Sequence, residues 1–240
     1  MKISIIIPTL NEEEVIDKTL RQIYDNLNTI DHEIIITDSG STDRTIDIAK
    51  KYGRVVSDTS PKRTIASNRN NGARYASGDY LVFIDADIFI PEPSHFFRML
   101  IEDFAADPKL LGATVKIGIL PDVANTLDRT IMTFANRLQW FNNNVIHTGG
   151  ASGEFQMIKR SAFETIHGYK EYLAMMEDND LFIRLSKIGR THIDMRLTAY
   201  NTGRRPHAIG WPKMIWEWAI NYWSVRLFDK AYSKKWNRIG

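Results

Sequence analysis

The stretch Asp79-Tyr-Leu-Val-Phe-Ile-Asp-Ala-Asp87 is the part of the sequence that decides the fold. Its apolar run, Tyr80 to Ile84, has the length of a strand and is continuous, as in a parallel sheet whose strands are covered on both faces. Asp85 and Asp87 follow directly, and ligands of open α/β sheets bind beyond the carboxyl ends of the strands. Two carboxylates there suit Mg²⁺ or Mn²⁺ on a phosphate group. The alternative is that they only end the strand and cap the next turn.

Length and composition limit the class of protein. A chain of 240 residues is long enough for one large α/β domain or two small ones. The net charge of +2 gives no reason to expect nucleic acid, and the absence of cysteine excludes disulfides, thiol catalysis and zinc–thiolate sites. The run Ile3 to Ile7 is too short for a signal peptide, and no run approaches the roughly 18–20 apolar residues that span a bilayer. We expect a cytoplasmic protein, soluble or peripheral on the cytoplasmic face of a membrane.

Strand-like and helix-like segments alternate as far as Ile84. Strands are expected at 3–7, 33–37, 54–57 and 80–84, and helices at about 12–27, 43–52 and 64–76. Such an order forms right-handed strand–helix–strand units, so it predicts an α/β fold with a mostly parallel sheet. Farther on, the patterns predict a helix capped by Ser94, helices that begin at Ser161 and Leu181, and a helix around 127–138. They also predict strands at 112–120, 155–158 and 191–195, an asparagine loop at 142–144 and a glycine-rich loop at 147–153.

The last 30 residues, 211–240, differ in character from the rest. They hold five of the six tryptophans, at positions 211, 216, 218, 223 and 236, and six Lys or Arg against two acidic residues. We expect a C-terminal amphipathic helical segment that is aromatic and basic. It packs on its own domain, contacts a second subunit, or lies at a membrane interface with its aromatic side chains at the headgroup level. The coincidence of basic and aromatic residues favours the membrane, while nothing in the sequence indicates an oligomeric state.

Five polar segments are expected at one rim of the sheet: 8–12, 38–43, 68–72, the pair Asp85 and Asp87, and Glu177-Asp178. The first four follow or lead into consecutive parallel strands, so topology alone brings their loops together. Asp38 is suited to reading a nucleobase, and Arg69 to neutralising phosphate. A carboxylate that arrives later in the chain is suited to act as general base. Such a site activates a hydroxyl while a metal ion and cations stabilise a leaving phosphate.

These motifs closely resemble, in order and spacing, those of the family 2 glycosyltransferases. The matching segments are Ile5-Ile-Ile-Pro-Thr-Leu-Asn-Glu12, Asp38-Ser-Gly-Ser-Thr-Asp43, Arg69-Asn-Asn-Gly72, Ala76-Ser-Gly-Asp-Tyr80, Phe83-Ile-Asp-Ala-Asp87 and Glu177-Asp-Asn-Asp-Leu181. The resemblance implies the GT-A fold, Rossmann-like with helices on both faces, over residues 1–210, with a nucleotide-binding half at about 1–120 and an acceptor half at about 121–210. It also implies inverting, Mn²⁺- or Mg²⁺-assisted transfer from a nucleoside-diphosphate sugar (UDP or GDP) to a hydroxyl or lipid phosphate of a glycan or lipid-linked acceptor.

Roles follow from the resemblance residue by residue. On the donor side, it assigns Pro8, Leu10, Glu12 and Asp38 to the nucleoside pocket with Arg69 nearby, and Asp85 and Ala86 to the ribose and diphosphate side. It assigns Asp87 to the metal, His207 to a third metal position, and Arg204 and Arg205 to the diphosphate. On the acceptor side, it assigns Asp178 to the general base, and Gly149 and Gly150 to the acceptor loop beside Glu177. Thr37 stands where the family often has a further Asp.

Several of these residues have plainer interpretations. Glu12 is also suited to a helix start, Asp38 to a turn cap, and Asp178 to the N-cap of a helix that begins at Leu181. Gly149-Gly150 is also typical of a flexible turn, and Arg204-Arg205 of a solvated pair.

Three other functions remain open at this point. A phosphohydrolase with a nucleophilic Asp imitates Asp85-Ala-Asp87, but its strand is usually the first of the chain and is followed by Thr or Val, whereas Ile88-Phe89 follow here. A nucleotidyltransferase needs a glycine-rich basic loop after the first strand, and Pro8-Thr-Leu-Asn-Glu12 is not one. A non-catalytic sugar-nucleotide binder predicts that Asp178→Asn leaves function intact.

Overall fold

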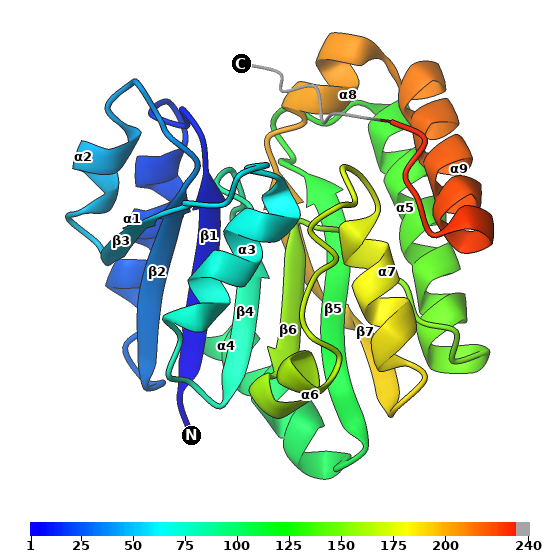
Figure 1. Ribbon diagram of the computed structural model, residues 1–240, viewed down its shortest axis with the longest axis horizontal. Coiled ribbons are helices and arrows are strands. Elements are labelled where there is room, and N and C mark those ends of the chain that lie inside the picture. The colour runs from blue at the N-terminus through cyan, green and yellow to red at the C-terminus, as the bar shows by residue number, and fades with distance from the viewer. Residues whose placement is uncertain (234–240) are drawn as a thin grey trace.

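The computed structural model describes residues 1–233, so Trp236 lies outside the described part of the chain. Its centre is a seven-stranded sheet in the order β3-β2-β1-β4-β6-β5-β7 (Figure 1). The strands are β1 (Ile3–Thr9), β2 (His32–Asp38), β3 (Arg54–Ser57), β4 (Tyr80–Ile84), β5 (Leu110–Ile119), β6 (Phe155–Lys159) and β7 (Arg190–Asn201). The helical elements are α1 (Ile16–Asn26), α2 (Thr45–Ala49), α3 (Ile65–Arg74), α4 (Pro93–Ala106), α5 (Thr126–Trp140), the π-helical turn η1 (Phe141–Val145), α6 (Arg160–Thr165), α7 (Glu177–Leu185), α8 (Arg204–Ile209) and α9 (Trp211–Phe228).

Helices cover both faces of the sheet, which confirms the predicted fold class. Every residue of β1 and β4 is buried, because a continuous apolar run supplies side chains to both faces. One face packs against α1 and α4 through Leu20 and Phe97. The opposite face packs against α3, α6 and α7, with Phe83 of β4 between Phe163 and Tyr169.

Strand β6 reverses the direction of the sheet between two parallel sets. It runs antiparallel to both β4 and β5, whereas β1, β2, β3 and β4 are mutually parallel and β5 is parallel to β7. The pairing of Ile84 with Phe155 brings the start of β6 to the carboxyl end of β4. The glycine-rich loop before β6 therefore arrives at the same rim as Asp85 and Asp87.

Local predictions fail where tertiary contacts decide the element. Helix α4 has Glu92 at its N-cap, and the Ser94 hydroxyl instead donates to the carbonyl of Asn26 at 2.5 Å. The predicted loop at 142–144 is a π-helical turn, and β7 extends six residues beyond the predicted end at Met195. Helix α7 begins at Glu177 with Met176 at its N-cap, so the prediction that Asp178 caps a helix from Leu181 is wrong.

Candidate active site

A buried arginine lies at the centre of the rim. The Arg69 side chain on α3 is 1% exposed, and its Nη2 atom donates to Asp85 Oδ1 at 2.8 Å. Its Nη1 atom donates to Glu177 Oε1 at 2.9 Å, and Nη2 also contacts the carbonyl of Gly153 at 2.9 Å. A guanidinium tolerates such burial only when it is paired and hydrogen-bonded. Arg69 is therefore an internal counter-ion here, and its predicted contact with phosphate stays a prediction.

Asp178 lies in the first turn of α7, beside this ion pair. Its Oδ1 atom accepts from the backbone N–H of Asn179 at 2.7 Å. A Cβ atom added at Gly153 would lie 3.1 Å from Asp178 Oδ2, so the loop before β6 passes directly against this carboxyl group. Burial, and then the neighbouring Glu177 carboxylate, raise the pKa of Asp178 well above its usual range. A carboxyl group with a pKa raised toward neutral pH is suited to accept a proton from a hydroxyl.

Asp87 lies in a second polar cluster, near α8. Its Oδ2 atom accepts from the Thr202 hydroxyl at 2.6 Å and lies 3.5 Å from Arg204 Nη2. The same Arg204 nitrogen donates to Glu12 Oε2 at 2.9 Å, so one cation links two carboxylates. The adjacent Arg205 turns away, to Glu217 of α9 at 3.4 Å. The structure thus separates the two arginines that the sequence assigned together.

Asp38 mainly organises the loop around it. It is buried, and its Oδ2 atom accepts from the backbone N–H groups of Gly40 and Ser41, both at 2.8 Å. The Ser41 hydroxyl also donates to its Oδ1 atom. These bonds are those of the turn-cap interpretation, which leaves the nucleobase contact as a prediction. Of the other nucleoside-side candidates, Pro8 is buried in β1 and Leu10 is exposed at the rim.

His207 has a partner other than the predicted metal position. Its Nε2 atom lies 2.9 Å from Asp128 Oδ2, and the indole N–H of Trp211 donates to Asp128 Oδ1 at 2.6 Å. Asp128 is buried on α5, so these two contacts fix α8 and the start of α9 onto α5. This contact involves one ring nitrogen of His207, and metal-ligating histidines commonly hold a carboxylate through their other nitrogen, so the third metal position stays a prediction.

The glycine pair is held firmly against α7. Gly149 and Gly150 are buried and have φ angles of +76° and +139°, values that side chains rarely adopt. A Cβ atom at Gly149 would lie 2.4 Å from the carbonyl oxygen of Phe182, and Asn143 donates to the carbonyl of Gly150 at 2.7 Å. The predicted flexible turn is therefore a packed one beside the helix that carries Asp178.

Sequence reasoning missed two residues of the site, Thr202 and Glu154. A carboxylate directly beside an apolar strand is the pattern that identifies Asp85, and the same pattern in the sequence could have identified Glu154, which directly precedes the strand that begins at Phe155. Its backbone carbonyl accepts from the N–H of Asp85 at 3.3 Å, and burial together with the Asp85 carboxylate raises the pKa of Glu154 to about 7.

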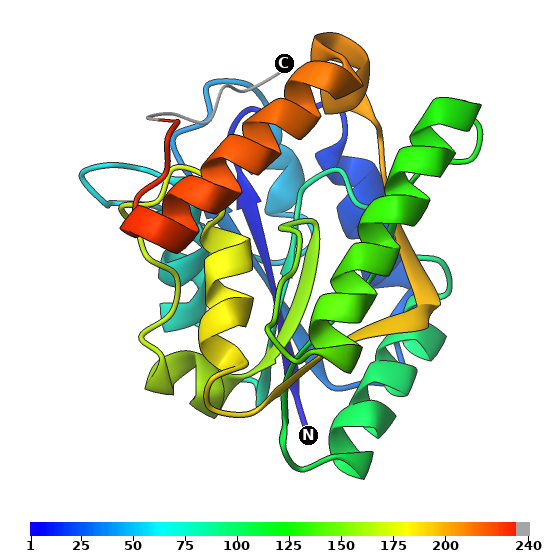
Figure 2. The same ribbon diagram turned by 90° about the vertical axis from the view of Figure 1, so that its right-hand side faces the viewer.

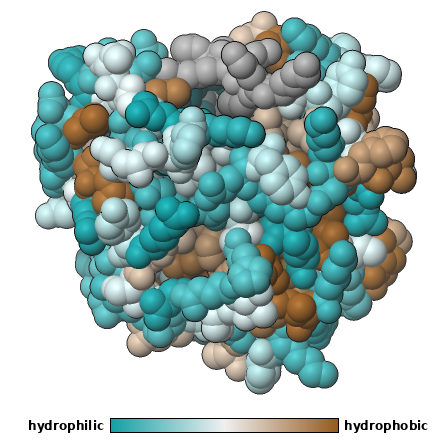
Figure 3. Space-filling model, in the orientation of Figure 1, coloured by the Kyte–Doolittle hydropathy of each residue, from teal (hydrophilic) through white to brown (hydrophobic). Residues whose placement is uncertain are grey.

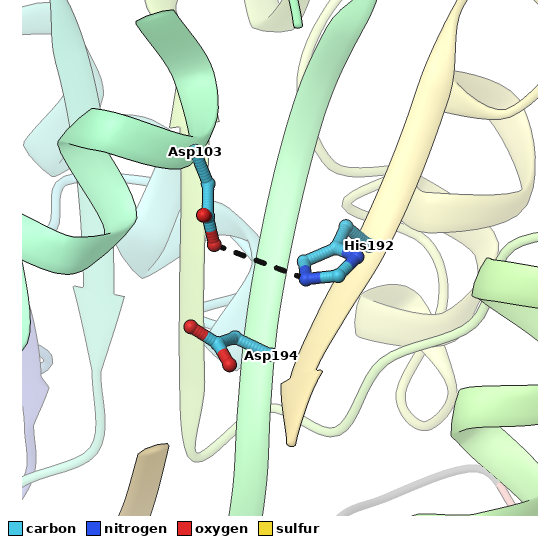
Figure 4. Close-up of side chains that lie close together, drawn as sticks. All are labelled: Asp103, His192 and Asp194. Carbon is cyan, nitrogen blue, oxygen red and sulfur yellow. Dashed lines mark ion pairs between the residues drawn. The ribbon is translucent and has the colours of Figure 1, made fainter. Parts of the chain in front are cut away.

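A second cluster of potential metal ligands lies away from this rim, around the first half of β7. Figure 4 shows Asp103 of α4 close to His192 and Asp194 of β7, with Asp103 Oδ2 3.9 Å from His192 Nε2. One potential ligand atom from each of these three residues lies within 4.8 Å of the other two, and within residues 1–233 they form the group of His, Asp or Glu side chains that meets this distance for a metal ion. Arg196 already neutralises it, since Nη2 lies 2.7 Å from Asp103 Oδ2 and 2.8 Å from Asp194 Oδ2. The cluster is an ion-pair network that joins α4 to β7.

The sheet order and the helices on both of its faces show that the chain has the GT-A glycosyltransferase fold. Two solved structures illustrate this: a mannosyltransferase from Pyrobaculum calidifontis in complex with GDP-mannose and Mn²⁺ (TM-score 0.65, 21% identity, 83% of this chain and 56% of that one), and residues 1–349 of TarS from S. aureus in complex with UDP-GlcNAc (TM-score 0.64, 18% identity, 83% and 58%). At these identities the likeness concerns the fold alone.

The chain belongs to glycosyl transferase family 2, whose model matches residues 4–166. The succinoglycan biosynthesis protein ExoA of Rhizobium meliloti (strain 1021) is 30% identical over 197 residues, which are 77% of this chain and 58% of that protein. A chondroitin synthase of Pasteurella multocida (strain Pm70) is 28% identical over 195 residues, 78% of this chain and 19% of that protein. The chain therefore spans only part of the length of these relatives. Within the described residues, no helix is both long and apolar enough to cross a bilayer.

Proposed function

We propose that this chain transfers a sugar from a nucleoside-diphosphate sugar to an acceptor hydroxyl or lipid phosphate, with inversion at the anomeric carbon. Asp178 is the general base and Asp87 a ligand of the divalent cation. The observation that carries the proposal is the buried Arg69, which joins Asp85 of the donor side to Glu177, the neighbour of Asp178. The guanidinium of Arg69 thereby fixes the donor side of the site relative to the residue next to the proposed base.

Each charged residue has a step in a single displacement. Asp178 removes the proton of the acceptor hydroxyl while the acceptor oxygen forms its bond to the anomeric carbon. The bond from that carbon to the diphosphate oxygen breaks on the opposite side, which inverts the configuration. Arg204, 3.5 Å from Asp87, is placed to meet the negative charge that develops on the diphosphate. Asp87, from the nucleotide-binding half (about 1–120), and Arg204, from the acceptor half (about 121–210), thus act together on the diphosphate.

The residues around Asp87 fit a hard divalent cation. Asp87, the Thr202 hydroxyl and Glu12 offer oxygen atoms, which Mg²⁺ and Mn²⁺ prefer. A bound cation there supplies charge stabilisation to a diphosphate. One solved neighbour is in complex with GDP-mannose and Mn²⁺ and another with UDP-GlcNAc, which supports UDP or GDP as the nucleotide of the donor.

We further propose that α9 lies against a membrane surface and so receives a lipid-linked acceptor. Trp216, Trp223 and Phe228 on α9 are each more than half exposed. The two acidic residues of the segment pair with arginine and lysine of the domain, while Lys213 and Arg226 stand exposed. Aromatic side chains next to basic ones suit the headgroup region of an anionic bilayer.

Helix α5 extends this apolar surface. Its residues Leu127, Phe134 and Leu138 recur at helical spacing, and all three are more than half exposed because Asn136 holds the opposite side of α5 to β5. Figure 2 shows α5 and α9 on the same side of the molecule, and hydrophobic residues reach the right-hand margin of Figure 3, the side of both helices in Figure 1. Exposed apolar side chains gathered on two helices of one side of the molecule suit an interaction surface. The cytoplasmic location remains a prediction.

The decisive experiment compares wild type with Asp178→Asn on a panel of UDP-, GDP- and dTDP-sugars with Mn²⁺. We expect donor binding, measured by thermal shift, to persist in the variant while donor turnover falls about 10²- to 10⁴-fold. Asp25→Asn, an exposed change on α1, is the matched control.

Two outcomes would favour the other functions. Unchanged function in Asp178→Asn would favour a non-catalytic sugar-nucleotide binder. Release of phosphate from p-nitrophenyl phosphate would favour a phosphohydrolase that uses Asp85.

A further inference from the structure

Glu154 stands opposite Asp85 at the point where β4 and β6 meet the rim. The antiparallel register pairs Ile84 with Phe155, so the next residue of β4 faces the residue before β6. The backbone N–H of Asp85 donates to the carbonyl of Glu154 at 3.3 Å, which extends the ladder by one step. Glu154 is therefore fixed by the sheet, in a position that does not depend on a mobile loop.

The side chains of Asp85 and Glu154 belong to the same face of the sheet. Ile84 and Phe155 pack in the core cluster on the α1 and α4 side. Because side chains alternate along a strand, their neighbours Asp85 and Glu154 project to the opposite face, which α3 and α7 cover. Asp85 confirms this direction, since it reaches Arg69 of α3.

Two further contacts locate Glu154 between the donor carboxylates and the base. Gly153, the residue before it, lies against Asp178, since a Cβ atom there would be 3.1 Å from Asp178 Oδ2. On the other side, Asn201 Nδ2 donates to Glu154 Oε1 at 3.5 Å, and Thr202, next to Asn201, donates to Asp87. The carboxyl group of Glu154 thus lies among Asp85, Asp178 and the end of β7.

The geometry of the proposed displacement indicates which part of the donor lies next to Glu154. In a displacement, the anomeric carbon lies between the acceptor oxygen at Asp178 and the diphosphate oxygen at Asp87. The sugar ring, with its hydroxyl groups, then occupies the space that Glu154 borders. A partly buried carboxyl group that accepts from one sugar hydroxyl discriminates between epimers, because an epimer that moves the hydroxyl leaves the carboxyl without that partner.

We propose that Glu154 accepts a hydrogen bond from a hydroxyl group of the donor sugar and so determines which sugar is transferred. This inference rests on the proposed function and adds to it the residue that sets donor specificity. The proposal assigns Glu154 to the sugar and Asp85 and Asp87 to the nucleotide and metal, so the two roles can be tested separately.

The test measures donor turnover by wild type, Glu154→Gln and Glu154→Ala with UDP-glucose, UDP-galactose, UDP-GlcNAc and GDP-mannose, each with Mn²⁺. For the donor that the wild type prefers, we expect kcat/KM to fall about 10-fold in Glu154→Gln and about 100-fold in Glu154→Ala. The ratio between the two UDP-hexose epimers should approach one. Binding of UDP or GDP alone, measured by calorimetry, should stay within about twofold of wild type. Glu164→Gln, an exposed change on α6, is the control.

The results separate this inference from the proposed function. If the wild type turns over no nucleotide sugar, the proposed function fails. If the wild type is active and both variants keep its ratio of epimers, the proposal for Glu154 is overturned. An equal loss of affinity for UDP or GDP alone would also overturn it, because that outcome assigns Glu154 to the nucleotide or to the fold.

Discussion

Replacement of Arg69 by methionine tests the central ion pair most directly. Methionine keeps the unbranched stem of arginine to about the position of Nε but leaves Asp85 and Glu177 without their cation. Removing one partner of a buried pair costs about 3–5 kcal/mol of unfolding free energy. For a domain of this size, each kcal/mol shifts the melting temperature by about 2–4 °C, so we expect Arg69→Met to melt roughly 6–20 °C below wild type.

The pH dependence of that loss has a definite sign. Burial raises the pKa values of Asp85 and Glu177, while the positive charge of Arg69 lowers them. Loss of Arg69 should therefore raise both pKa values further. A folded-state pKa above the unfolded value of about 4 favours unfolding as pH rises. The deficit of Arg69→Met should therefore be largest near neutral pH and shrink toward about pH 4.

Urea denaturation, followed by circular dichroism at several pH values, measures this loss. Arg74→Met on the same helix is the matched control, since Arg74 is 67% exposed and lies 3.7 Å from Glu171. An exposed pair of that kind contributes about 0–1 kcal/mol. The reasoning about Arg69 would be refuted if both variants unfolded within about 1 kcal/mol of wild type at neutral pH. Glu177→Gln combined with Arg69→Met should recover part of the loss, because one uncompensated carboxylate is removed.

Three further predictions concern metal, proton and membrane. Asp87→Ala should abolish the Mn²⁺-dependent part of donor binding, and calorimetry that finds that part unchanged would contradict the metal assignment. Because burial raises the pKa of Asp178 and the proposed mechanism uses its deprotonated form as base, kcat/KM should rise with pH from about 6 to 9, and a flat profile in that range would exclude Asp178 as base. Trp216→Ser with Trp223→Ser should weaken co-sedimentation with anionic liposomes about tenfold or more; equal sedimentation with unchanged melting temperature would remove α9 from the membrane contact.

The first half of the fold could be predicted because its signals are local. Each strand from β1 to β4 is a short apolar run followed by turn formers and a helix, and right-handed connections leave little freedom in how such units pair. Strand β6 has an equally clear apolar run, but nothing local specifies that it inserts antiparallel between β4 and β5. The position of Glu154 at the rim depends on that insertion.

Motif spacing in the sequence identifies candidate site residues, but it does not determine which partners their side chains bind in the folded chain. The sequence predicts Asp85, Asp87 and Asp178 as site residues, and in the structure Asp85 contacts Glu154 while Asp178 lies against the neighbouring Gly153. The burial of Arg69 and the pairing of His207 with Asp128 depend on residues 108 and 79 positions away, respectively. A cation seen only in sequence is indistinguishable from one that faces a phosphate.

Arg69 also links two parts of the candidate site that are far apart in the sequence. Asp85 comes from the end of β4, while Asp178 comes from the first turn of α7, and no strand pairing joins these two elements directly. Arg69 bonds to Asp85 and to the residue next to Asp178 through two nitrogens of one rigid plane. Lysine has a single nitrogen and cannot reproduce that fork. In the proposed mechanism, a folded Arg69→Lys variant should therefore lose more in turnover than in nucleotide binding, since small errors in the placement of the proposed base reduce the rate strongly.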